Sequence, residues 1–277
     1  MENTGPPSLA DEEEFIGPSG RSILLTHGAP APKVFVLLHG MAASPLQFGE
    51  LGRRLYARGA NVLIPRLPRH GHDDRLTDVL QHLTVEEMTT FARRSVETAR
   101  TLGHRTIVAG FSLGGLLAAW LAQHESFERA VAISPFLGIA LVPRRVAAQA
   151  ARWALRVPNR FLWWNPVLRE RLMPAHGYPR YPTHAVAQAY RLAHELFAEA
   201  ERAEPATRTI DFVLNGSEVV VNNRSAVRLA AAWRAHGAAV AVRHLRSLPP
   251  SHDIIEPLRE DWILPRVYPE LVELIDR

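Results

Sequence analysis

The sequence has 277 residues, which is enough for one large domain or two small ones. Hydrophobic residues make up 47% and charged residues 22%, a globular composition that excludes a wholly disordered chain. The absence of cysteine excludes disulfides, cysteine-ligated zinc, iron–sulfur clusters and thiol catalysis. The net charge is only +4, and there is no basic run or nucleic-acid-binding motif, so we expect no nucleic-acid partner.

The N-terminal residues do not resemble a secretion signal. They read MENTGPPSLADEEEF, an acidic stretch without the basic and apolar regions of a signal peptide, and we expect residues 1–12 to form a flexible tail. The uncharged stretch 106–123 contains glycines, a serine and a threonine, so it is better explained as strand, turn and helix than as a membrane span. We therefore expect a cytoplasmic protein with no integral membrane segment.

Strands and helices alternate through the first half of the chain. Apolar runs predict strands and helical spacings predict helices, and Thr84 with Glu87 forms a capping box before the second helix. The predicted strands are 22–26, 34–38, 61–64, 105–109 and 130–133, and the predicted helices are 45–58, 85–101 and 113–123. This order indicates βαβ units, and therefore an α/β fold with a mostly parallel central sheet flanked by helices.

The alternation stops at residue 136. Residues 136–204 contain no convincing strand and end in a predicted helix over 183–203. The alternation then resumes, with strands at 209–214 and 239–245 and helices at 223–236 and 264–276. We predict one core domain formed by residues 13–135 and 205–277, interrupted by a helical insertion at 136–204.

A G-x-S-x-G motif runs from Gly110 to Gly114, with Ser112 at its centre. A predicted strand precedes it directly and an Ala/Leu-rich helix follows it, which is the strand–turn–helix setting of a nucleophile elbow. Such a turn places the serine above the carboxyl edge of the sheet, with the helix N-terminus favouring negative charge beneath it. Ser112 is therefore the candidate nucleophile.

A serine hydroxyl needs a base, and His252 is the best-placed histidine because it follows the last predicted strand through a Pro-rich loop. Glu218 is the carboxylate in the loop after strand 209–214, and the order serine, acid, histidine fits this fold. Asp211 lies inside that strand, and its side chain should point away from the site. Asp253 is adjacent to His252 in the chain, which gives poor geometry for a hydrogen bond to the imidazole. Glu218 is therefore the predicted acid.

The tetrahedral intermediate of acyl transfer needs preorganised donors to its oxyanion. The backbone N–H of Leu113, one residue after the serine, is one candidate. The loop after strand 34–38 offers the other, the Met41 N–H, and His39 in that loop is expected to brace it structurally.

The segment 68–74 invites a metal hypothesis, because His70, His72 and a nearby carboxylate, together with His39, could ligate zinc. The spacing resembles the H-x-H-x-D-H of metallo-hydrolases, but the spacer before the aspartate is missing and no second histidine follows. We expect no metal and interpret this segment as a loop at the rim of the pocket.

These motifs together resemble the α/β-hydrolase superfamily, in particular small bacterial carboxylesterases and monoacylglycerol lipases. The matching segments are VLLHGMAAS at 36–44, the His-Gly-His region at 65–73, AGFSLGG at 109–115, NGSEVVVNN at 215–223 and LPPSHDII at 248–255. The resemblance implies an α/β-hydrolase fold, a Ser112–Glu218–His252 triad, a cap formed by residues 136–204, and no cofactor. The family more often has aspartate at the position of Glu218 and glycine at that of Arg69.

The leading hypothesis is a metal-independent serine hydrolase that cleaves carboxylic esters, medium-chain or monoacylglycerol-like, through an acyl-enzyme. The insertion contains large apolar side chains that are candidates to line the substrate site, namely Phe161, Trp163, Trp164 and Met173. The alternative is that they only anchor the insertion to the core domain. The alternatives are an acyltransferase or amidase on the same triad, and a non-catalytic binding protein of the same fold. The expected partner is a small-molecule ester, and the expected state is a monomer or weak homodimer.

Overall fold

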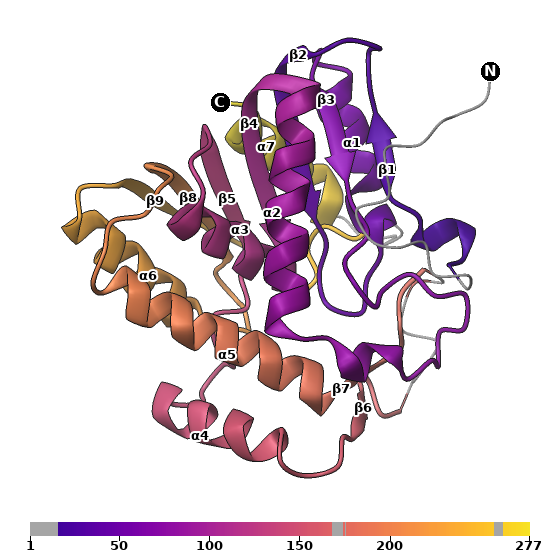
Figure 1. The fold of residues 1–277 in the computed structure, drawn as a ribbon, viewed down its shortest axis with the longest axis vertical. Coiled ribbons are helices and arrows are strands. Elements are labelled where there is room, and N and C mark those ends of the chain that lie inside the picture. The colour runs from indigo at the N-terminus through magenta and orange to yellow at the C-terminus, as the bar shows by residue number, and fades with distance from the viewer. Residues whose placement is uncertain (1–15, 168–173, 175, 258–262) are drawn as a thin grey trace.

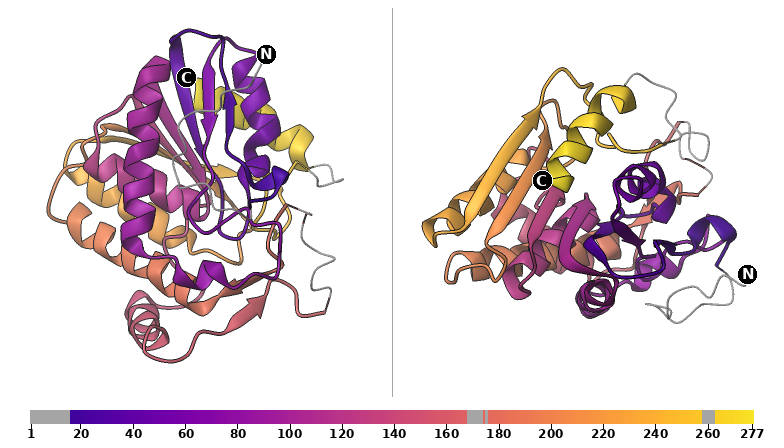
Figure 2. Two further views of the ribbon diagram at one scale, coloured as in Figure 1. Left: turned by 45° about the vertical axis from the view of Figure 1, so that its right-hand side comes forward. Right: turned by 90° about the horizontal axis from the view of Figure 1, so that it is seen from above.

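The computed structural model describes residues 16–167, 174, 176–257 and 263–277 and contains a seven-stranded sheet between two layers of helices (Figures 1 and 2). The strand order is β1-β3-β2-β4-β5-β8-β9, and every neighbouring pair is parallel except β1 with β3. The strands are β1 (Ile23–Leu25), β2 (Ala31–Leu38), β3 (Asn61–Ile64), β4 (Gly103–Phe111), β5 (Arg129–Ile133), β8 (Thr209–Asn215) and β9 (Ala239–Leu245). The predicted α/β fold with a mostly parallel sheet is confirmed.

The two faces of the sheet bury separate cores. Along β2, Val34, Val36 and Leu38 point into one core while Phe35 and Leu37 point into the other, as the period of two requires. Covering both faces explains why the strands read as continuous apolar runs. The first face is covered by α2 (Val85–Leu102), α3 (Leu113–His124) and α6 (Asn223–Ala235), and the second by α1 (Gly49–Tyr56) and α7 (Ile263–Asp276).

Local signals explain where several of these elements begin. The predicted capping box is present, since Thr84 Oγ1 accepts from the Glu87 N–H and Glu87 Oε2 accepts from the Thr84 N–H. The helix predicted over 45–58 is instead a 3₁₀ turn, Pro45–Phe48, followed by α1. The Ser44 hydroxyl accepts from the Leu46 N–H, and Pro45 occupies the first turn, so the chain starts tightly before it widens into a helix.

The inserted segment 136–204 adds no strand to the main sheet among its described residues. It contains α4 (Arg144–Ala154), β6 (Phe161–Trp163), β7 (Arg180–Pro182) and α5 (Thr183–Ala200). The expectation of no strand was wrong, because β6 and β7 pair antiparallel. Three-residue strands are too short for an alternating pattern to emerge in the sequence. In Figure 1, α5 crosses over the sheet domain and α4 lies outermost, on α5.

None of the described helices combines the length and apolar composition that crossing a bilayer would require.

The turn between β4 and α3 brings two backbones into direct contact. A Cβ atom on Gly110 would lie 2.0 Å from the Gly114 carbonyl oxygen, and one on Gly114 would lie 1.9 Å from the Leu38 carbonyl oxygen. Neither contact is tolerable for a real atom, so glycine is required at both positions by packing, and no side chain can retreat to make room.

We predict that Gly110→Ala and Gly114→Ala each lower the free energy of unfolding by roughly 2 kcal/mol or more, because the backbones must separate. Gly49→Ala is the matched control: it lies in α1 and its new methyl would meet only the Arg53 guanidinium at 3.7 Å. That variant should stay within about 1 kcal/mol of wild type. Urea denaturation measures all three, and equal stabilities would contradict the packing argument.

Candidate active site

Ser112 lies at the sharp turn between β4 and α3, with φ 53° and ψ −110°, a strained conformation for a residue with a side chain. Two hydrogen bonds hold the turn on both sides: the Ser112 N–H donates to the Ile133 carbonyl at 3.0 Å, and the Gly114 N–H donates to the His39 carbonyl at 3.1 Å. The neighbouring strands β5 and β2 therefore fix the turn, which has the geometry of a nucleophile elbow.

The sequence-predicted serine, histidine and acid are brought together. The Ser112 hydroxyl donates to His252 Nε2 at 2.8 Å, and His252 Nδ1–H donates to Glu218 Oε2 at 2.8 Å. The Phe111 ring packs against the His252 imidazole with centroids 4.9 Å apart. The three side chains come from loops after β4, β8 and β9, at the carboxyl edge of the sheet, and their arrangement can carry a proton from the serine to the imidazole.

Glu218 is held by both of its carboxylate oxygens. Its side chain is fully buried; Oε2 faces His252, while Oε1 accepts from the N–H groups of Val219, Val220 and Val221 at 2.9, 2.8 and 3.4 Å. Burial opposes ionisation, but the hydrogen bond and charge of His252 together with these backbone amides lower the pKa of Glu218 below its ordinary value. The carboxylate is therefore ionised and oriented toward the imidazole.

The other two acids considered from the sequence lie elsewhere. Asp211 sits within β8, with carboxylate oxygens 3.6 Å from Arg129 and 3.8 Å from Arg243. Asp253 accepts from the Gln47 side-chain amide at 2.8 Å and from the backbone N–H groups of Ile255 and Glu256.

Asn215, which the sequence reasoning did not single out, joins the two loops that carry Glu218 and His252. Its side-chain amide donates to the carbonyls of Pro249 and Ser251 at 3.0 and 2.8 Å, while its Oδ1 accepts from the Ser217 N–H at 2.9 Å. Asn215 is fully buried at the end of β8. The available signal was an amide ending an apolar strand, directly before the predicted acid loop.

The backbone donors near Ser112 separate into occupied and open ones. The Gly40 N–H donates to Gln47 Oε1, the Ala42 N–H donates to His70 Nε2, and the Gly114 N–H donates to His39. Within the described part of the chain, no acceptor lies at the Met41 or Leu113 N–H. These are the two amides expected from the sequence to receive an oxyanion.

His39 and His70 use both ring nitrogens to brace this loop. His39 Nδ1–H donates to the Gly40 carbonyl and Nε2 accepts from the Leu67 N–H. His70 Nδ1–H donates to the Pro68 carbonyl and Nε2 accepts from the Ala42 N–H. In both imidazoles one ring nitrogen donates to a backbone carbonyl and the other accepts from a backbone N–H, so neither ring has a lone pair left for a metal.

Arg69 adopts φ 65°, in the left-handed region where glycine is favoured. Its guanidinium pairs with Glu87 Oε1 at 2.7 Å, the same carboxylate that caps α2. An ion pair therefore ties this turn to α2 at the position where the similar family often has glycine.

A second polar network lies behind the Met41 loop, and no motif in the sequence marks it. The Ser44 hydroxyl donates to His176 Nδ1 at 3.0 Å, and His176 Nε2–H donates to Glu256 Oε1 at 3.0 Å. All three side chains are buried. This is another serine–histidine–glutamate chain, but it lies in the interior and joins the insertion to the Met41 loop and to the loop that follows His252.

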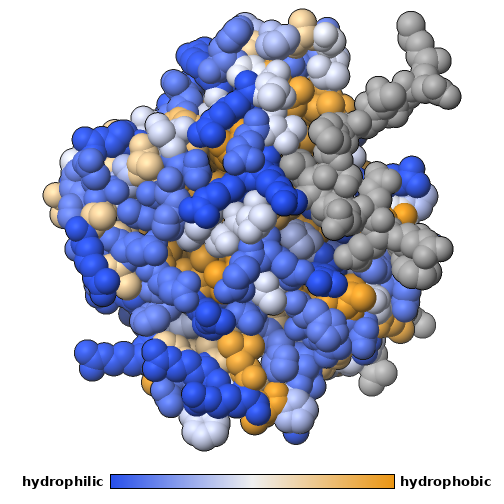
Figure 3. Space-filling view, viewed as in Figure 1, coloured by the Kyte–Doolittle hydropathy of each residue, from blue (hydrophilic) through white to orange (hydrophobic). Residues whose placement is uncertain are grey.

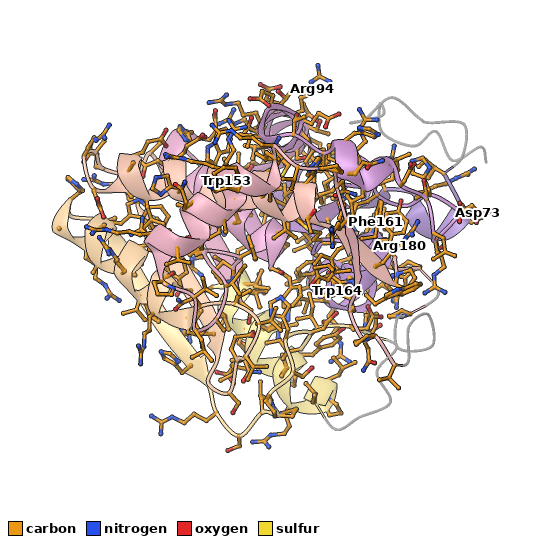
Figure 4. The ribbon with its side chains drawn as sticks, turned by 90° about the horizontal axis from the view of Figure 1, so that it is seen from below. Asp73, Arg94, Trp153, Phe161, Trp164 and Arg180 are labelled. Atoms are coloured by element: carbon orange, nitrogen blue, oxygen red, sulfur yellow. The ribbon has the colours of Figure 1, made fainter. Side chains whose placement is uncertain are left out.

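The predicted substrate-binding residues lie in different surroundings. Trp164, labelled in Figure 4, is partly buried and packs against the same core as Met41. Its ring lies tilted against that of Tyr181, with centroids 4.3 Å apart. Phe161 lies under the Arg180 guanidinium at 4.2 Å. Trp163 is half-buried in β6, on the same side of the strand as Phe161. Met173 lies outside the described residues.

The buried His70 provides a pH test. Burial is the main cause that lowers the pKa of His70 to about 4, and burial with the neighbouring His70 lowers that of His39 as well. An unfolded histidine titrates near pH 6.5, so between about pH 6.5 and 4 the unfolded chain binds a proton that the folded chain refuses. The stability that the neutral, buried imidazole contributes is fully present above this window. It is lost as the pH falls through the window, and the free energy of unfolding decreases by roughly 3 kcal/mol for His70.

We predict that His70→Gln is less stable than wild type at pH 8 but loses less stability on acidification to pH 4.5, because one buried imidazole is gone. His104→Gln, which changes an exposed histidine, is the control and should keep the wild-type slope. Urea denaturation over this pH range measures the slopes, and an unchanged slope in His70→Gln would contradict the argument.

Comparisons with known proteins agree with this geometry. A family model described as the alpha/beta hydrolase family matches residues 35–273. A search of curated proteins found no match. The resemblance expected from the motifs is therefore confirmed at the level of the family.

Solved structures show the same fold at low sequence identity. The structure reported for the metagenome-derived lipolytic enzymes LipS and LipT has TM-score 0.72 and 16% identity, covering 94% of this chain and 99% of that one. The monoacylglycerol lipase of Paleococcus ferrophilus has TM-score 0.70 and 18% identity, covering 92% and 98%. A soluble variant of monoglyceride lipase from Saccharomyces cerevisiae has TM-score 0.65 and 12% identity, covering 92% and 90%. With its nucleophile elbow and its match over most of its length, the chain belongs to the alpha/beta hydrolase family.

Proposed function

We propose that the protein is a serine hydrolase of carboxylic esters, with Ser112 as nucleophile, His252 as general base and acid, and Glu218 as the orienting carboxylate. The observation that carries the proposal is the unbroken chain of two 2.8 Å hydrogen bonds from the Ser112 hydroxyl through the imidazole to Glu218. Lipolytic enzymes and monoacylglycerol lipases among the structural neighbours support ester chemistry.

In the first half-reaction, Ser112 Oγ attacks the ester carbonyl carbon while its proton passes to His252 Nε2. The resulting oxyanion accepts from the Met41 and Leu113 N–H groups. When the intermediate collapses, the carbon–oxygen bond to the alcohol breaks and His252 gives its proton to the leaving oxygen. The ionised Glu218 stabilises the imidazolium throughout this exchange.

In the second half-reaction, water attacks the acyl-enzyme carbonyl and gives a proton to His252. Collapse of the second tetrahedral intermediate breaks the bond to Ser112 Oγ, which takes the proton back from the imidazole. The carboxylic acid leaves and the starting enzyme is restored.

We also propose that residues 136–204 act as a cap over this site. The Tyr178 N–H donates to the Ala42 carbonyl at 2.7 Å, and the Phe136 N–H donates to the Ser112 carbonyl at 2.9 Å. The segment thus contacts both the Met41 loop and the elbow. Trp164 and Met41 supply partly buried apolar surface there, which suits the acyl chain of a medium-chain or monoacylglycerol-like ester.

The first test is covalent. A fluorophosphonate probe should label Ser112 and not the buried Ser44, although both serines lie beside a histidine that is bonded to a glutamate. Ser112→Ala should lose labelling and activity, whereas Ser44→Ala should still be labelled. Peptide mapping by mass spectrometry identifies the adduct, and an adduct on another serine would refute the assignment.

The acid is tested in the same assay. Glu218→Gln should reduce kcat by roughly a thousandfold or more with the fold retained, because the imidazolium loses its charged partner. Asp211→Asn, at an acid paired with arginines inside the sheet, is the control and should keep substantial activity. The reverse result would move the acid to Asp211.

The acyl pocket is tested with p-nitrophenyl esters of increasing chain length. We expect kcat/KM to rise from acetyl to medium-chain esters, by at most about fourfold per methylene, which corresponds to about 0.8 kcal/mol. Trp164→Ala should flatten this rise, while Trp153→Ala, at an exposed position on α4, should leave it unchanged. A preference for acetyl esters that neither substitution alters would contradict an acyl pocket under the insertion.

A further inference from the structure

The segment 137–167 carries positive charge only. The sequence has no aspartate or glutamate between Glu128 and Glu170, whereas this segment contains five arginines. One of them, Arg144, stacks its guanidinium over the Phe197 ring at 3.8 Å. The other four are exposed, and none forms an ion pair with any described residue; they are Arg145, Arg152, Arg156 and Arg160.

The outward face of α4 sets an apolar stripe beside this charge. The helix packs on α5 through Ala147 and Ala151, so its opposite side faces solvent. On that side, residues spaced by four and then three positions line up along the helix and form two neighbouring stripes. The apolar stripe is Val146, Ala150 and Trp153, and the polar one is Arg145, Gln149 and Arg152. Trp153 is 56% exposed, which is unusual for so large a ring.

The exposed apolar surface continues toward the candidate active site. Leu141, three residues before α4, is fully exposed. The Ala140 N–H donates to the Val220 carbonyl at 3.0 Å, so this stretch lies beside the loop of Glu218, where Val219 is also exposed. In Figure 3, strongly hydrophilic and hydrophobic surface lie next to each other along the lower edge, where Figure 1 places α4.

We infer that this surface, made of α4 and residues 139–141, docks on an anionic lipid bilayer. Arginines are attracted to anionic headgroups, and a tryptophan with aliphatic neighbours suits the boundary between headgroups and acyl chains. Phosphate attraction alone, as in nucleic-acid binding, would not account for the exposed Leu141 and Val146. A symmetric dimer through this surface would bring arginines against arginines, which is unfavourable.

Docking of this kind is independent of the proposed reaction, so it is tested on the inactive Ser112→Ala protein. The protein should co-sediment with vesicles of equal parts phosphatidylcholine and phosphatidylglycerol, and it should stay in the supernatant with pure phosphatidylcholine vesicles. Adding Arg145→Gln and Arg152→Gln should weaken binding on the order of tenfold or more, because each arginine near the surface contributes roughly fivefold. Adding Arg94→Gln and Arg105→Gln is the charge-matched control, since these exposed arginines lie on α2 and β4, and it should bind like the parent.

Two further readouts separate insertion from simple charge attraction. Vesicle addition should shift the tryptophan emission to shorter wavelength, and Trp153→Phe should remove most of that shift. Leu141→Ser with Val146→Ser should weaken binding even though the charge is unchanged. Equal binding to both kinds of vesicle, equal losses in the two arginine pairs, or a solution dimer that Trp153→Ala dissociates would overturn the inference.

Discussion

The close crossing of backbones at the start of α3 is the constraint on which the site depends. Gly110, Gly114 and the Leu38 carbonyl approach each other so closely that no Cβ fits between them. The crossing sets the height of Ser112 above the sheet and simultaneously fixes its neighbours, because the Gly114 N–H is bonded to His39 in the loop after β2. The serine and the loop carrying the Met41 amide are therefore positioned by one piece of packing.

A buried polar network connects the remaining loops to this crossing. Gln47 accepts from the Gly40 N–H and donates to Asp253, the residue next to His252. Burial raises the pKa of Asp253, with the nearby Glu256 adding to the effect. Each polar group here depends on its partner, since an unpaired buried group is costly. Moving one loop would thus leave polar groups in another loop unsatisfied. The loops that carry Ser112, Met41 and His252 therefore behave as one unit.

Much of this architecture was readable from the sequence, because the strands and helices of the core repeat on a short local period. The predicted strand 61–64 and the start of the predicted helix at 113 coincide with β3 and α3. Ser112, Glu218 and His252 could be proposed together because each follows a predicted strand, and parallel strands end at one edge. That expectation of proximity needed no knowledge of side-chain orientation.

The features that escaped prediction depend on contacts between residues far apart in the chain. Ser44 and His176 are 132 positions apart, and Gln47 and Asp253 are 206 apart. No local pattern marks such pairs, and an isolated histidine or glutamine has many possible roles. The strands β6 and β7 were missed for a related reason, since three residues define no period.

The way α4 is attached has a consequence for the motions of the folded chain. Its interior contact centres on Ala147 and Ala151 with Ala187 and Tyr190 of α5, a cluster distinct from both main cores, and partly buried neighbours such as Leu155 pack around it. Alanines bury little apolar area, so detaching this helix exposes far less surface than unfolding the sheet. Opening of α4 is therefore a local event of low free energy, and its amide hydrogens should exchange with solvent well before those of β4 and α3.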